Sequence, residues 1–590
     1  MSFVVLVNPD IERLQERFGT VTLTKLKPQP PLGLCSIAAT LLERGHSVSI
    51  VDGYAESLTP TRLADRVLEF NPEVVGFTVT CMNAEQAELT ATLIKQRNKE
   101  IMIVFGGPQV TLQPQSVLAC QAVDFGVLGE GDLSLPQLVD SFENGGEPSS
   151  IPGLILREPS GNVVYTKAPV PIESLDDLPF PARHLLNWSN YDLSGDYLLP
   201  AKKVFTISSS RGCPYRCTFC SSAVYWNCSY HARSANSVVD EIEILVREFG
   251  ADGLNFREDN FMVDRKRVRA ICNELLARKV KISWVCEARV DNVDRETLEL
   301  MRDAGLVGLW CGVESGSPRI LKQIRKGYTV EQVRSAFELF NDLGINTRAG
   351  FMIGFPDETE EDIQQTYHLA EDISPSHAYF QAYVAFPRGE LYDEVVREKL
   401  YCDQWRDVYR VRPRNIPAES YVRLEASLRE KFEIYKLKRN KQASRLPMLG
   451  SRVLVFCTSG IAVIESVLRQ IRKDNPDCIL ETLSNQALAA RIKECEDVSR
   501  QYVYTAEHVA AATLPNEWLQ SLKEQHFDTI VITFSNGLGQ GYDEVIEVAK
   551  SLCPGKLLSY NRLGVVGEID IEQQGTGVDR TFSHDCELSQ

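Results

Sequence analysis

The sequence lacks any apolar run long enough to cross a lipid bilayer as a helix, which takes roughly 20 residues. Its first residues, MSFVVLVNPD, have neither the basic flank nor the apolar length of a secretion signal. The run VLVFCTSGIAVI, which begins at residue 453, is also too short. These absences predict a cytoplasmic protein without a membrane span.

The sequence also lacks an excess of basic residues. Its 63 Lys and Arg are outnumbered by 80 Asp and Glu, which gives a formal net charge of −17. That charge disfavours an extended phosphate-binding surface, so nucleic acid is not an expected partner. The chain contains no repeat of fixed period and no low-complexity tract.

Cysteine, in contrast, is abundant, with 16 residues scattered along the chain. Cytoplasmic cysteines stay reduced, so this number indicates free thiols or metal ligands and argues against a disulfide framework. The composition, 44% hydrophobic and 24% charged, is typical of globular proteins. A chain of 590 residues is expected to form about two to four domains.

Residues 1–145 alternate short apolar runs, such as FVVLVNP and EVVGFTV, with amphipathic helical stretches, such as GLCSIAATLLERGH. This alternation predicts an α/β domain with a doubly wound parallel sheet, of Rossmann-like or flavodoxin-like type. Sheets of this type bind ligands beyond the carboxyl ends of their strands. The loops that follow those ends are therefore the first places where we expect a site.

The rest of the chain divides into four further segments. Residues 146–200 are rich in Pro, Gly and Ser and are interpreted as a linker with a small hairpin. Residues 201–390 contain six strand-and-helix units, which predict a partial (β/α)6 barrel similar to a TIM barrel. Residues 391–450 are expected to be a charged helical extension, and residues 451–590 a C-terminal α/β domain of unassigned role.

Three cysteines follow the first predicted barrel strand in the stretch RGCPYRCTFCSS. Cys213, Cys217 and Cys220 have the spacing C-x3-C-x2-C. Three thiolates on one tight loop can bind three irons of a cubane cluster and leave the fourth iron open to another ligand. The alternative is a structural zinc site completed by His231 or Cys228, although zinc sites usually come as paired C-x2-C or C-x2-H elements.

At these residues the sequence resembles the radical SAM superfamily, over about residues 203–390. The resemblance extends to GLNFREDNF, CEARVD, GVESGSPRILKQIRKGYT, GFMIGFPDET and FPRGELY, in that order. It implies a 4Fe-4S cluster, S-adenosylmethionine (SAM) bound at the open iron, and an external electron donor such as flavodoxin or ferredoxin. It also implies a set of SAM-binding residues: Phe219, Glu258, Asp259, Arg289, Glu314, Ser315 and Ile353.

Two of these residues have structural alternatives. Arg289 could be a solvated surface charge, and Glu314 could be an acidic residue that stabilises a helix N-terminus. Their order at successive strand ends favours the SAM-binding role. Cys228, Cys272, Cys286 and Cys311 are interpreted as buried apolar thiols.

The first domain resembles the cobalamin-binding domains that precede many radical SAM modules, in the segments PPLGLCSIAATLLERGHSVSIVD, VGFTVTCMN, VFGGPQVT and VLGEGD. Its glycines at strand ends let a broad ligand approach the backbone. A dinucleotide is disfavoured because no G-x-G-x-x-G follows the first strand; a domain that only packs is the other alternative. The cobalamin-binding residues implied are Thr78, Thr80, Gly106, Gly107, Pro108, Gln109, Gly129, Glu130 and Gly131.

The sequence departs from many methyl-transferring cobalamin proteins because it lacks the Asp-x-His-x-x-Gly loop whose histidine binds cobalt. The single histidine before the linker, His46, precedes a predicted strand and is expected at the opposite sheet edge. Gln109 stands where many relatives have histidine. Any cobalamin is therefore expected to lack a histidine ligand.

With both cofactors, the resemblance implies methylation of an unactivated carbon of a small molecule, peptide or lipid. The alternatives are cobalamin-assisted radical oxidation, cyclisation or ring contraction, and a non-catalytic cofactor-binding sensor. Methylthio transfer to RNA is less favoured because neither a second cluster motif nor a basic domain is visible. In the last segment, Gly460, Gly537, Gly539 and Gly541 could cradle a phosphate, or simply close turns.

Overall fold

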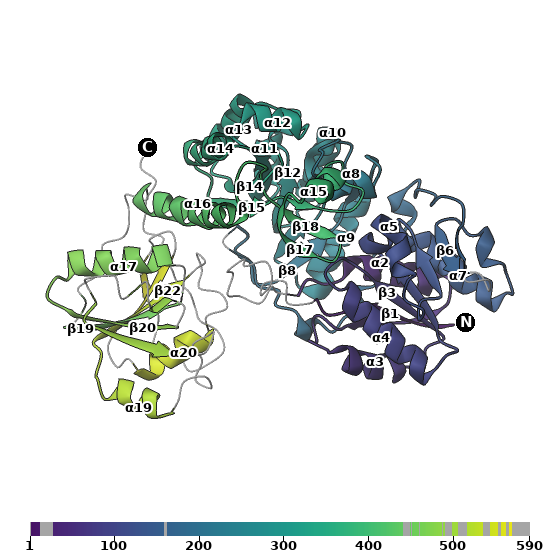
Figure 1. Cartoon of the computed structure of the whole chain (residues 1–590), viewed down its shortest axis with the longest axis horizontal. Helices are drawn as coiled ribbons and strands as arrows, with labels where there is room; N and C mark the ends of the chain where they lie inside the picture. The colour runs from purple at the N-terminus through teal and green to yellow at the C-terminus, as the bar shows by residue number, and fades with distance from the viewer. Residues whose placement is uncertain are drawn as a thin grey trace. The chain divides into compact units, whose positions relative to one another are not determined.

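The structure is a computed structural model, and the chain forms two compact units, Met1–Glu425 and Ala426–Gln590 (Figure 1). Each unit is described by itself. The structure describes residues 2–11, 28–157, 162–196, 198–439, 449, 451–458, 461–485, 488–489, 492, 498–504, 516–534, 543–552, 556–561 and 566–568.

The N-terminal sheet has the strand order β2-β1-β3-β4-β5-β6-β7, and its first five strands are parallel. This confirms the doubly wound sheet predicted for this region. The antiparallel pair β6 and β7 comes from the segment interpreted as a linker and extends the sheet beyond β5. The strands are β1 (Phe3–Asn8), β2 (Ser47–Asp52), β3 (Val74–Thr78), β4 (Met102–Gly106), β5 (Phe125–Val127), β6 (Leu154–Arg157) and β7 (Val163–Tyr165).

Helices cover both faces of this sheet, which explains why its strands are continuous apolar runs. Val4 and Leu6 of β1 pack in the core that includes α2 (Leu32–Glu43) and α7 (Gly131–Glu143). Val5 and Val7 pack in the core on the other face, with α3 (Pro60–Leu68) and α4 (Ala84–Arg97). Two short helices, α5 (Pro108–Leu112) and α6 (Pro114–Val117), follow β4.

The second sheet of the first unit is the predicted partial barrel. Its six strands are all parallel and lie in chain order, and the two end strands, β8 and β15, do not pair with each other. The strands are β8 (Val204–Ile207), β11 (Gly253–Phe256), β12 (Ser283–Ala288), β13 (Leu306–Glu314), β14 (Asn346–Ile353) and β15 (His377–Ala382). The helices between them are α9 (Ala235–Phe249), α10 (Arg265–Ala277), α11 (Arg295–Asp303), α12 (Pro318–Gln323), α13 (Val330–Asp342) and α14 (Glu360–Ile373).

The two faces of the barrel sheet differ in burial. On β14, Thr347, Ala349 and Phe351 are fully buried against the helices, whereas the alternate residues Arg348 and Gly350 are only partly buried. Because side chains alternate along a strand, the second set faces the inside of the barrel. At Arg348 and Gly350 the concave face is therefore only partly covered, whereas Leu198 and Leu199 pack against Val285 of the sheet.

Local capping signals fix where the barrel helices start. The Thr329 and Thr359 side chains form capping boxes at α13 and α14, and Ser234 caps α9. At the other end, Gly250 takes the left-handed conformation with φ of 68° that ends α9. These signals fix the start of α9, α13 and α14 and the end of α9.

Residues that follow the barrel, expected to be helical, also form a small antiparallel sheet of order β16-β18-β17. The aromatic and β-branched residues of YCDQW and VYRV favour strands over the helix that was expected there. The elements are β16 (Val384–Ala385), α15 (Tyr392–Glu398), β17 (Tyr401–Trp405), β18 (Val408–Val411) and α16 (Ala418–Arg439).

The second unit contains a sheet of order β21-β20-β19-β22-β23-β24, parallel except for β24. This is the doubly wound order in which the chain starts in the middle and reverses direction. Gly460, Gly537, Gly539 and Gly541 lie outside the described residues. The elements are β19 (Arg452–Cys457), α17 (Ile461–Asp474), β20 (Ile479–Asn485), β21 (Arg500–Tyr504), α19 (Asn516–Lys523), β22 (Thr529–Phe534), α20 (Asp543–Leu552), β23 (Lys556–Asn561) and β24 (Val566–Glu568).

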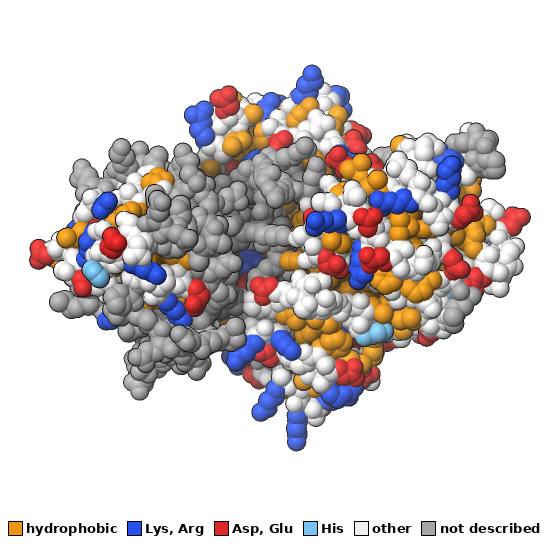
Figure 2. All heavy atoms as spheres, turned by 90° about the horizontal axis from the view of Figure 1, so that it is seen from below, with side chains coloured by type: hydrophobic (Ala, Val, Ile, Leu, Met, Phe, Trp, Pro, Cys, Tyr) orange, Lys and Arg blue, Asp and Glu red, His pale blue; other side chains and the backbone are white. Residues whose placement is uncertain are grey.

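None of the helices within the described residues is long and apolar enough to cross a membrane. On the face seen in Figure 2, acidic and basic side chains are interspersed.

Candidate functional site

The three cysteines of the C-x3-C-x2-C loop lie directly after β9 (Ser210–Gly212), which pairs antiparallel with β10 (Tyr230–Ala232). Gly212 makes this pairing possible, since it has φ of 80° and a Cβ there would lie 2.3 Å from the Ser229 carbonyl oxygen. Cys217 is buried, and Cys213 and Cys220 are partly buried. The loop thus offers three thiols from one rigid base.

The thiols are close enough to influence one another. The pKa of Cys220 is raised to about 11, mainly by burial and with a smaller contribution from the neighbouring Cys217. Burial also raises the pKa of Cys213, with a smaller contribution from Cys217. Thiols in such a setting ionise only when a metal or cationic group takes the charge. A soft-ligand set of this kind fits an iron–sulfur cluster.

The alternative of a closed zinc site has two candidate fourth ligands. His231 lies on β10 opposite Arg211, and the Cys228 thiol donates to the Ala223 carbonyl oxygen at 3.7 Å. Among the described residues no three His, Cys, Asp or Glu side chains form a group suited to one metal ion. Cys228 is only partly buried, unlike the fully buried thiol that was expected. Cys272, Cys286 and Cys311 are buried as predicted.

Arg289 lies beside the cysteine loop and is not a solvated surface charge, since only 6% of it is exposed. Its Nη1 lies 3.8 Å from the Cys217 sulfur, and two other nitrogens donate to the Asp291 carboxylate at 3.0 and 2.9 Å. The guanidinium stacks on Tyr215, 3.7 Å from the ring centroid. Arg289 therefore places a positive charge next to the Cys217 thiol, a predicted cluster ligand.

Glu314 ends β13 and is not at a helix N-terminus. Its backbone has φ of 67°, and its buried carboxylate accepts a hydrogen bond from Lys326 Nζ at 2.8 Å. The Lys326 ammonium also lies 5.5 Å from the ring centroid of Phe219, in the cysteine loop. Lys326 was not predicted as a site residue, although it lies inside the segment GVESGSPRILKQIRKGYT. No pattern of spacing distinguishes it there from the exposed Lys322 and Arg325.

The remaining predicted SAM residues on β13 and β14 are held through their backbone or by packing. Ser315 is fully buried and its hydroxyl lies 3.1 Å from the Thr366 hydroxyl. The Ile353 side chain is buried, and its carbonyl oxygen accepts a hydrogen bond from Tyr421 at 2.9 Å. Both residues lie at carboxyl ends of barrel strands, on the same side of the sheet as the cysteine loop.

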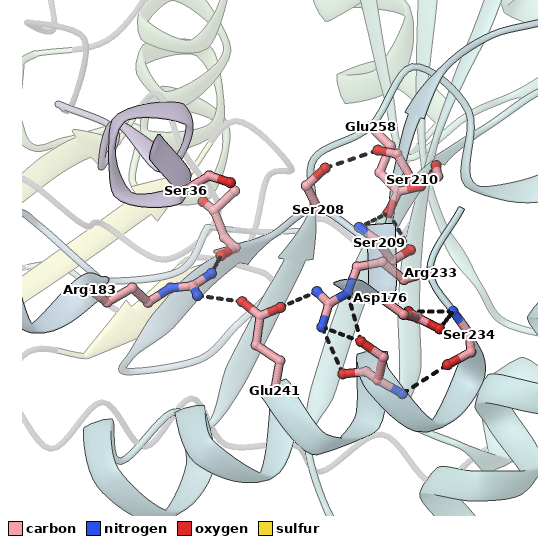
Figure 3. Close-up of polar contacts among 12 residues, drawn as sticks. Ser36, Asp176, Arg183, Ser208, Ser209, Ser210, Arg233, Ser234, Glu241 and Glu258 are labelled. Atoms are coloured by element: carbon pink, nitrogen blue, oxygen red, sulfur yellow. Dashed lines mark hydrogen bonds and ion pairs between the residues drawn. The ribbon is translucent and has the colours of Figure 1, made fainter. Parts of the chain in front are cut away.

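Glu258 and Asp259 follow β11 but differ in environment. The Glu258 carboxylate is buried and accepts hydrogen bonds from the Ser209 backbone nitrogen at 2.6 Å and from the hydroxyls of Ser209 and Ser210 (Figure 3). It therefore ties the ends of β8 and β11 together directly below the cysteine loop. Asp259 is exposed, although surrounding protein raises its pKa.

A cavity of about 490 Å³ lies at the carboxyl ends of the N-terminal sheet. Gly107 in its wall admits no side chain, because it has φ of 96° and a Cβ there would lie 2.9 Å from the Val79 oxygen; a Cβ on Gly131 would press on the Ile37 side chain at 3.0 Å. The predicted cobalamin residues on its wall are Thr78, Gly106, Gly107, Pro108, Gly129, Glu130 and Gly131.

Two predicted cobalamin residues do not line this cavity. The Thr80 backbone nitrogen and hydroxyl both bond to the Asn83 side chain, which fixes the turn into α4. Gln109 is buried and donates to Gln113 at 2.6 Å. His46 lies where it was expected, at the opposite sheet edge, with Nε2 2.9 Å from Asp140.

The other wall of the cavity comes from the barrel and from the segment 175–181. Sequence reasoning missed these residues, because only the fold brings β8 and α8 (Ser221–Tyr225) against the N-terminal sheet. The cavity and the cysteine loop thus lie on one boundary inside the first unit. The wall residues from this side include Phe180, Thr206, Ser208, Arg211, Tyr225, Trp226, Arg233 and Arg257.

Arg211 joins the two halves of this boundary. It lies two residues before Cys213, and its Nη1 donates to Glu130 at 2.6 Å and to Asp132 at 2.8 Å. Its Nη2 donates to Asp132 at 3.1 Å and to Ser36 at 3.3 Å. Glu130 and Asp132 flank Gly131 in the cavity wall. We call Arg211, Glu130 and Asp132 the interdomain clasp.

A second buried charge group supports the cavity from below (Figure 3). The Glu241 carboxylate binds both Arg183 and Arg233, and all three side chains are almost fully buried. Arg183 also donates to the Thr206 carbonyl oxygen at 2.7 Å. This group fastens the segment before β8 to α9, so Arg233 is held rigidly in the cavity wall.

Comparisons with known proteins agree with this arrangement. The chain matches the family model described as the Radical SAM superfamily over residues 207–370, which include the cysteine loop. It matches the model described as a B12 binding domain over residues 20–139, which include Gly106, Gly107, Gly129 and Gly131 of the cavity wall.

Two curated proteins are similar over much of this chain. An uncharacterized methyltransferase of Pyrococcus horikoshii is 33% identical over 413 residues, which are 70% of this chain and 87% of that protein. An anaerobic magnesium-protoporphyrin IX monomethyl ester cyclase of Rubrivivax gelatinosus is 31% identical over 373 residues, or 62% of this chain and 66% of the cyclase.

One solved structure shares the fold. It is the radical S-adenosylmethionine methyltransferase TsrM from Kitasatospora setae with cobalamin and a 4Fe-4S cluster bound. The similarity has a TM-score of 0.57 and 21% sequence identity, and covers 68% of this chain and 78% of TsrM.

Proposed function

This chain belongs to the cobalamin-dependent radical SAM enzymes, and on that premise we propose that it methylates an unactivated carbon of a small molecule, peptide or lipid. Its cofactors are a 4Fe-4S cluster, SAM and cobalamin. When bound, the cluster and SAM supply a 5′-deoxyadenosyl radical and cobalamin supplies the methyl group. One observation carries the proposal: the cysteine loop and the glycine-walled cavity lie on one boundary, joined by Arg211.

The residues at the cysteine loop bind and orient. Cys213, Cys217 and Cys220 hold the cluster, and Arg289 stabilises the Cys217 thiolate from 3.8 Å. The Glu314–Lys326 pair is buried and fixed, so it presents a preorganised charge to the ribose and methionine parts of SAM. Asp259 is exposed beside the loop, where its carboxylate accepts hydrogen bonds from Ser222, the Gly212 backbone and Trp226, and it is the carboxylate proposed for the SAM amino group.

The residues that line the cavity leave space for cobalamin and shield the substrate from water. Gly107 and Gly131 line the cavity wall, where a broad ligand can approach the backbone, and a Cβ on Gly107 would collide with the Val79 oxygen. Phe180 and Trp226 add apolar surface from the barrel side. A substrate placed between the two cofactors would then be shielded from solvent, which a reactive radical requires.

The proposal is tested by anaerobic reconstitution with iron, sulfide and hydroxocobalamin, followed by SAM and dithionite. We expect 5′-deoxyadenosine together with S-adenosylhomocysteine, each measured by chromatography. Cys217→Ala should lose the cluster absorbance and 5′-deoxyadenosine formation while it keeps the corrinoid spectrum. Zinc without iron in the oxygen-free protein would overturn the assignment.

A second candidate function is a cobalamin-assisted radical oxidation or cyclisation without methyl transfer. The similarity to the Rubrivivax gelatinosus cyclase supports it. The same assay separates the two functions, because this reaction would form 5′-deoxyadenosine with substrate but no S-adenosylhomocysteine.

A further inference from the structure

Four side chains on the concave face of the barrel stand side by side on adjacent strands. Glu287 on β12 pairs in register with Trp310 on β13, and Trp310 pairs with Arg348 on β14. Arg257 directly follows Phe256, which pairs with Cys286 on β12, so Arg257 stands next to Glu287. Neighbours in a parallel ladder point to the same face of the sheet. We call Arg257, Glu287, Trp310 and Arg348 the barrel belt.

Glu287 lies in a concave and still reachable place. It keeps 34% of its side-chain surface exposed. Even so, burial by the surrounding protein raises its pKa to about 7. Solvent can reach this carboxyl, yet the surrounding protein removes much of its hydration. Such a combination indicates a concave site, because a flat surface would leave the carboxyl hydrated. The carboxyl therefore faces the inside of the barrel.

Arg257 is only weakly neutralised. Its Nη1 lies 3.8 Å from Glu287 Oε1, longer than a hydrogen bond, and 55% of its side chain is exposed. Within the part of the chain that the structure describes, no other carboxylate lies within 4 Å of it. Arg257 also lines the cavity at the N-terminal sheet. Its guanidinium thus lies between the barrel interior and the cavity, with N–H groups available as hydrogen-bond donors.

The far side of the belt is firmly held. The Arg348 guanidinium lies 4.7 Å from the Trp310 ring and donates to Asp196 at 2.8 Å. On the same face of β14, Gly350 leaves the Trp310 indole uncovered, since a Cβ there would lie 3.6 Å from the indole nitrogen. The belt therefore offers one available cation, Arg257, and one flat aromatic wall.

The belt also lies within electrostatic reach of the cysteine loop. Asp259 raises the pKa of Glu287 and that of Cys213, which requires it to be near both. A molecule that contacts Arg257 is therefore close to the place where the radical forms and to the boundary with the cobalamin domain. Among the proposed SAM residues, Arg289 is already occupied by Asp291 and Cys217.

From this arrangement we propose that Arg257 and Glu287 form a substrate-recognition pair for a substrate that carries an anionic oxyacid group, a carboxylate or a phosphate. The inference rests on the proposed function, because it names the substrate class for the same site. A guanidinium with free donors binds such groups through two parallel hydrogen bonds. Glu287 in its neutral form leaves Arg257 available, whereas its ionised form repels an anion and competes for Arg257.

This competition predicts a pH dependence of binding. The charged groups that face Glu287 are Arg257, Glu258, Asp259 and Arg348. The affinity for a carboxylate should be highest below about pH 7 and should fall as the pH rises through the pKa of Glu287. Glu287→Gln should bind equally well on both sides of that value, because its side chain does not ionise. A role of Glu287 in packing alone would not produce this difference.

The test uses the full chain loaded with cluster and cobalamin, with SAM present and reductant absent. Binding of acetate and of inorganic phosphate is measured by ligand-observed NMR, and their relative affinities identify the preferred oxyacid. Only acetate is used for the pH series, because phosphate itself titrates near neutrality. Arg257→Met should weaken binding at least about tenfold. Arg302→Met, at an exposed position on α11, is the matched control and should change nothing.

Two results would overturn the inference: no measurable anion binding by the wild-type chain, or binding that Arg257→Met leaves intact. If Arg257→Met weakens SAM binding instead, Arg257 serves the cofactor and the substrate assignment is wrong. SAM cleavage by the same preparations is measured in parallel. Cleavage without an Arg257-dependent anion site would reject this inference and leave the proposed function standing.

Discussion

Lys326 and Glu314 form a buried pair whose two members depend on each other. Both side chains keep no more than 10% of their surface, and their charged atoms are 2.8 Å apart. Removal of one member would leave an uncompensated buried charge, which costs far more than an exposed pair is worth. Buried pairs of this kind are common near the proposed SAM site, so single substitutions there affect folding as well as binding.

We predict that Lys326→Met destabilises the first unit by about 3–5 kcal/mol, because Glu314 loses its partner. Arg325→Met is the matched control, since Arg325 pairs with Glu390 on the surface and should change stability by less than about 1 kcal/mol. Thermal and chemical unfolding measure both values. Equal effects of the two substitutions would show that the Lys326 pair is not buried in solution.

Glu358 makes a pH-dependent contribution to stability. Its carboxyl is fully buried, and one oxygen accepts hydrogen bonds from the Gly354 nitrogen at 2.5 Å and from the Phe355 nitrogen at 3.3 Å. The other oxygen has no hydrogen-bond partner among the residues that the structure describes. Burial raises its pKa from 4.5 to about 8. A raised folded-state pKa means that the folded state binds the proton more tightly than the unfolded state.

The stability from protonated Glu358 should therefore be complete below pH 4.5 and be lost as pH rises to about 8. The loss should amount to roughly 3–5 kcal/mol, because one pKa unit corresponds to about 1.4 kcal/mol. Glu358→Gln should show a smaller fall across this range in denaturant titrations. Glu360→Gln, an exposed change at the start of α14, serves as control. Parallel pH curves for wild type and Glu358→Gln would contradict the prediction.

At the scale of elements, the paired strands β9 and β10 form the base of the cysteine loop. Gly212 permits their close approach, because a Cβ there would overlap the Ser229 carbonyl oxygen at 2.3 Å. Within the loop that follows, the Cys220 nitrogen donates to the Cys217 oxygen at 3.2 Å, and the Thr218 nitrogen donates to the Ile324 oxygen at 3.1 Å. The position of the thiols thus depends on a backbone contact.

We predict that Gly212→Ala separates β9 from β10 and lowers the iron and sulfide content of the reconstituted protein to well below half of wild type. The control is Gly145→Ala, because Gly145 also has a positive φ but no atom within 4 Å of its would-be Cβ. That control should cost only about 1 kcal/mol and keep full iron content. Equal iron content in both variants would show that the loop does not need this pairing.

At the scale of the whole first unit, the interdomain clasp connects the cysteine loop with the wall of the cavity proposed for cobalamin. Arg211 contributes one positive charge against the two carboxylates of Glu130 and Asp132, all largely buried. The Tyr225 hydroxyl donates to the Gly129 carbonyl oxygen at 3.1 Å beside it. These contacts hold the two cofactor regions at one separation, which a reaction that uses both cofactors requires.

We predict that Arg211→Met leaves cluster and corrinoid content unchanged but loosens this separation. Backbone hydrogen exchange should become faster in residues 129–132 and 210–213. Arg211→Lys should give exchange rates between those of Arg211→Met and wild type, because lysine keeps the charge but cannot make the bidentate contact. The ratio of S-adenosylhomocysteine to 5′-deoxyadenosine should also fall. Unchanged hydrogen-exchange rates together with an unchanged product ratio would show that the interdomain clasp does not hold the two regions at a fixed separation.

The sequence by itself determined the α/β class, the parallel strands of residues 1–145 and of the partial barrel, and the family, because these follow from local patterns. Alternation of apolar runs and amphipathic helices fixes strands and crossovers, and the C-x3-C-x2-C loop with its following segments fixes the cofactor class. The hairpin β17–β18 was missed, because charged residues between its apolar ones resemble a surface helix.

Only the tertiary structure decided which side chains meet. Lys326 and Glu314 are 12 residues apart and Arg211 and Glu130 are 81 apart, and no spacing rule predicts such pairs. The belt of Arg257, Glu287, Trp310 and Arg348 depends on the register between adjacent strands, which a one-residue shift would reverse. Register and packing arise from the whole fold, so the sequence identified the cofactors and the structure located the proposed substrate contacts.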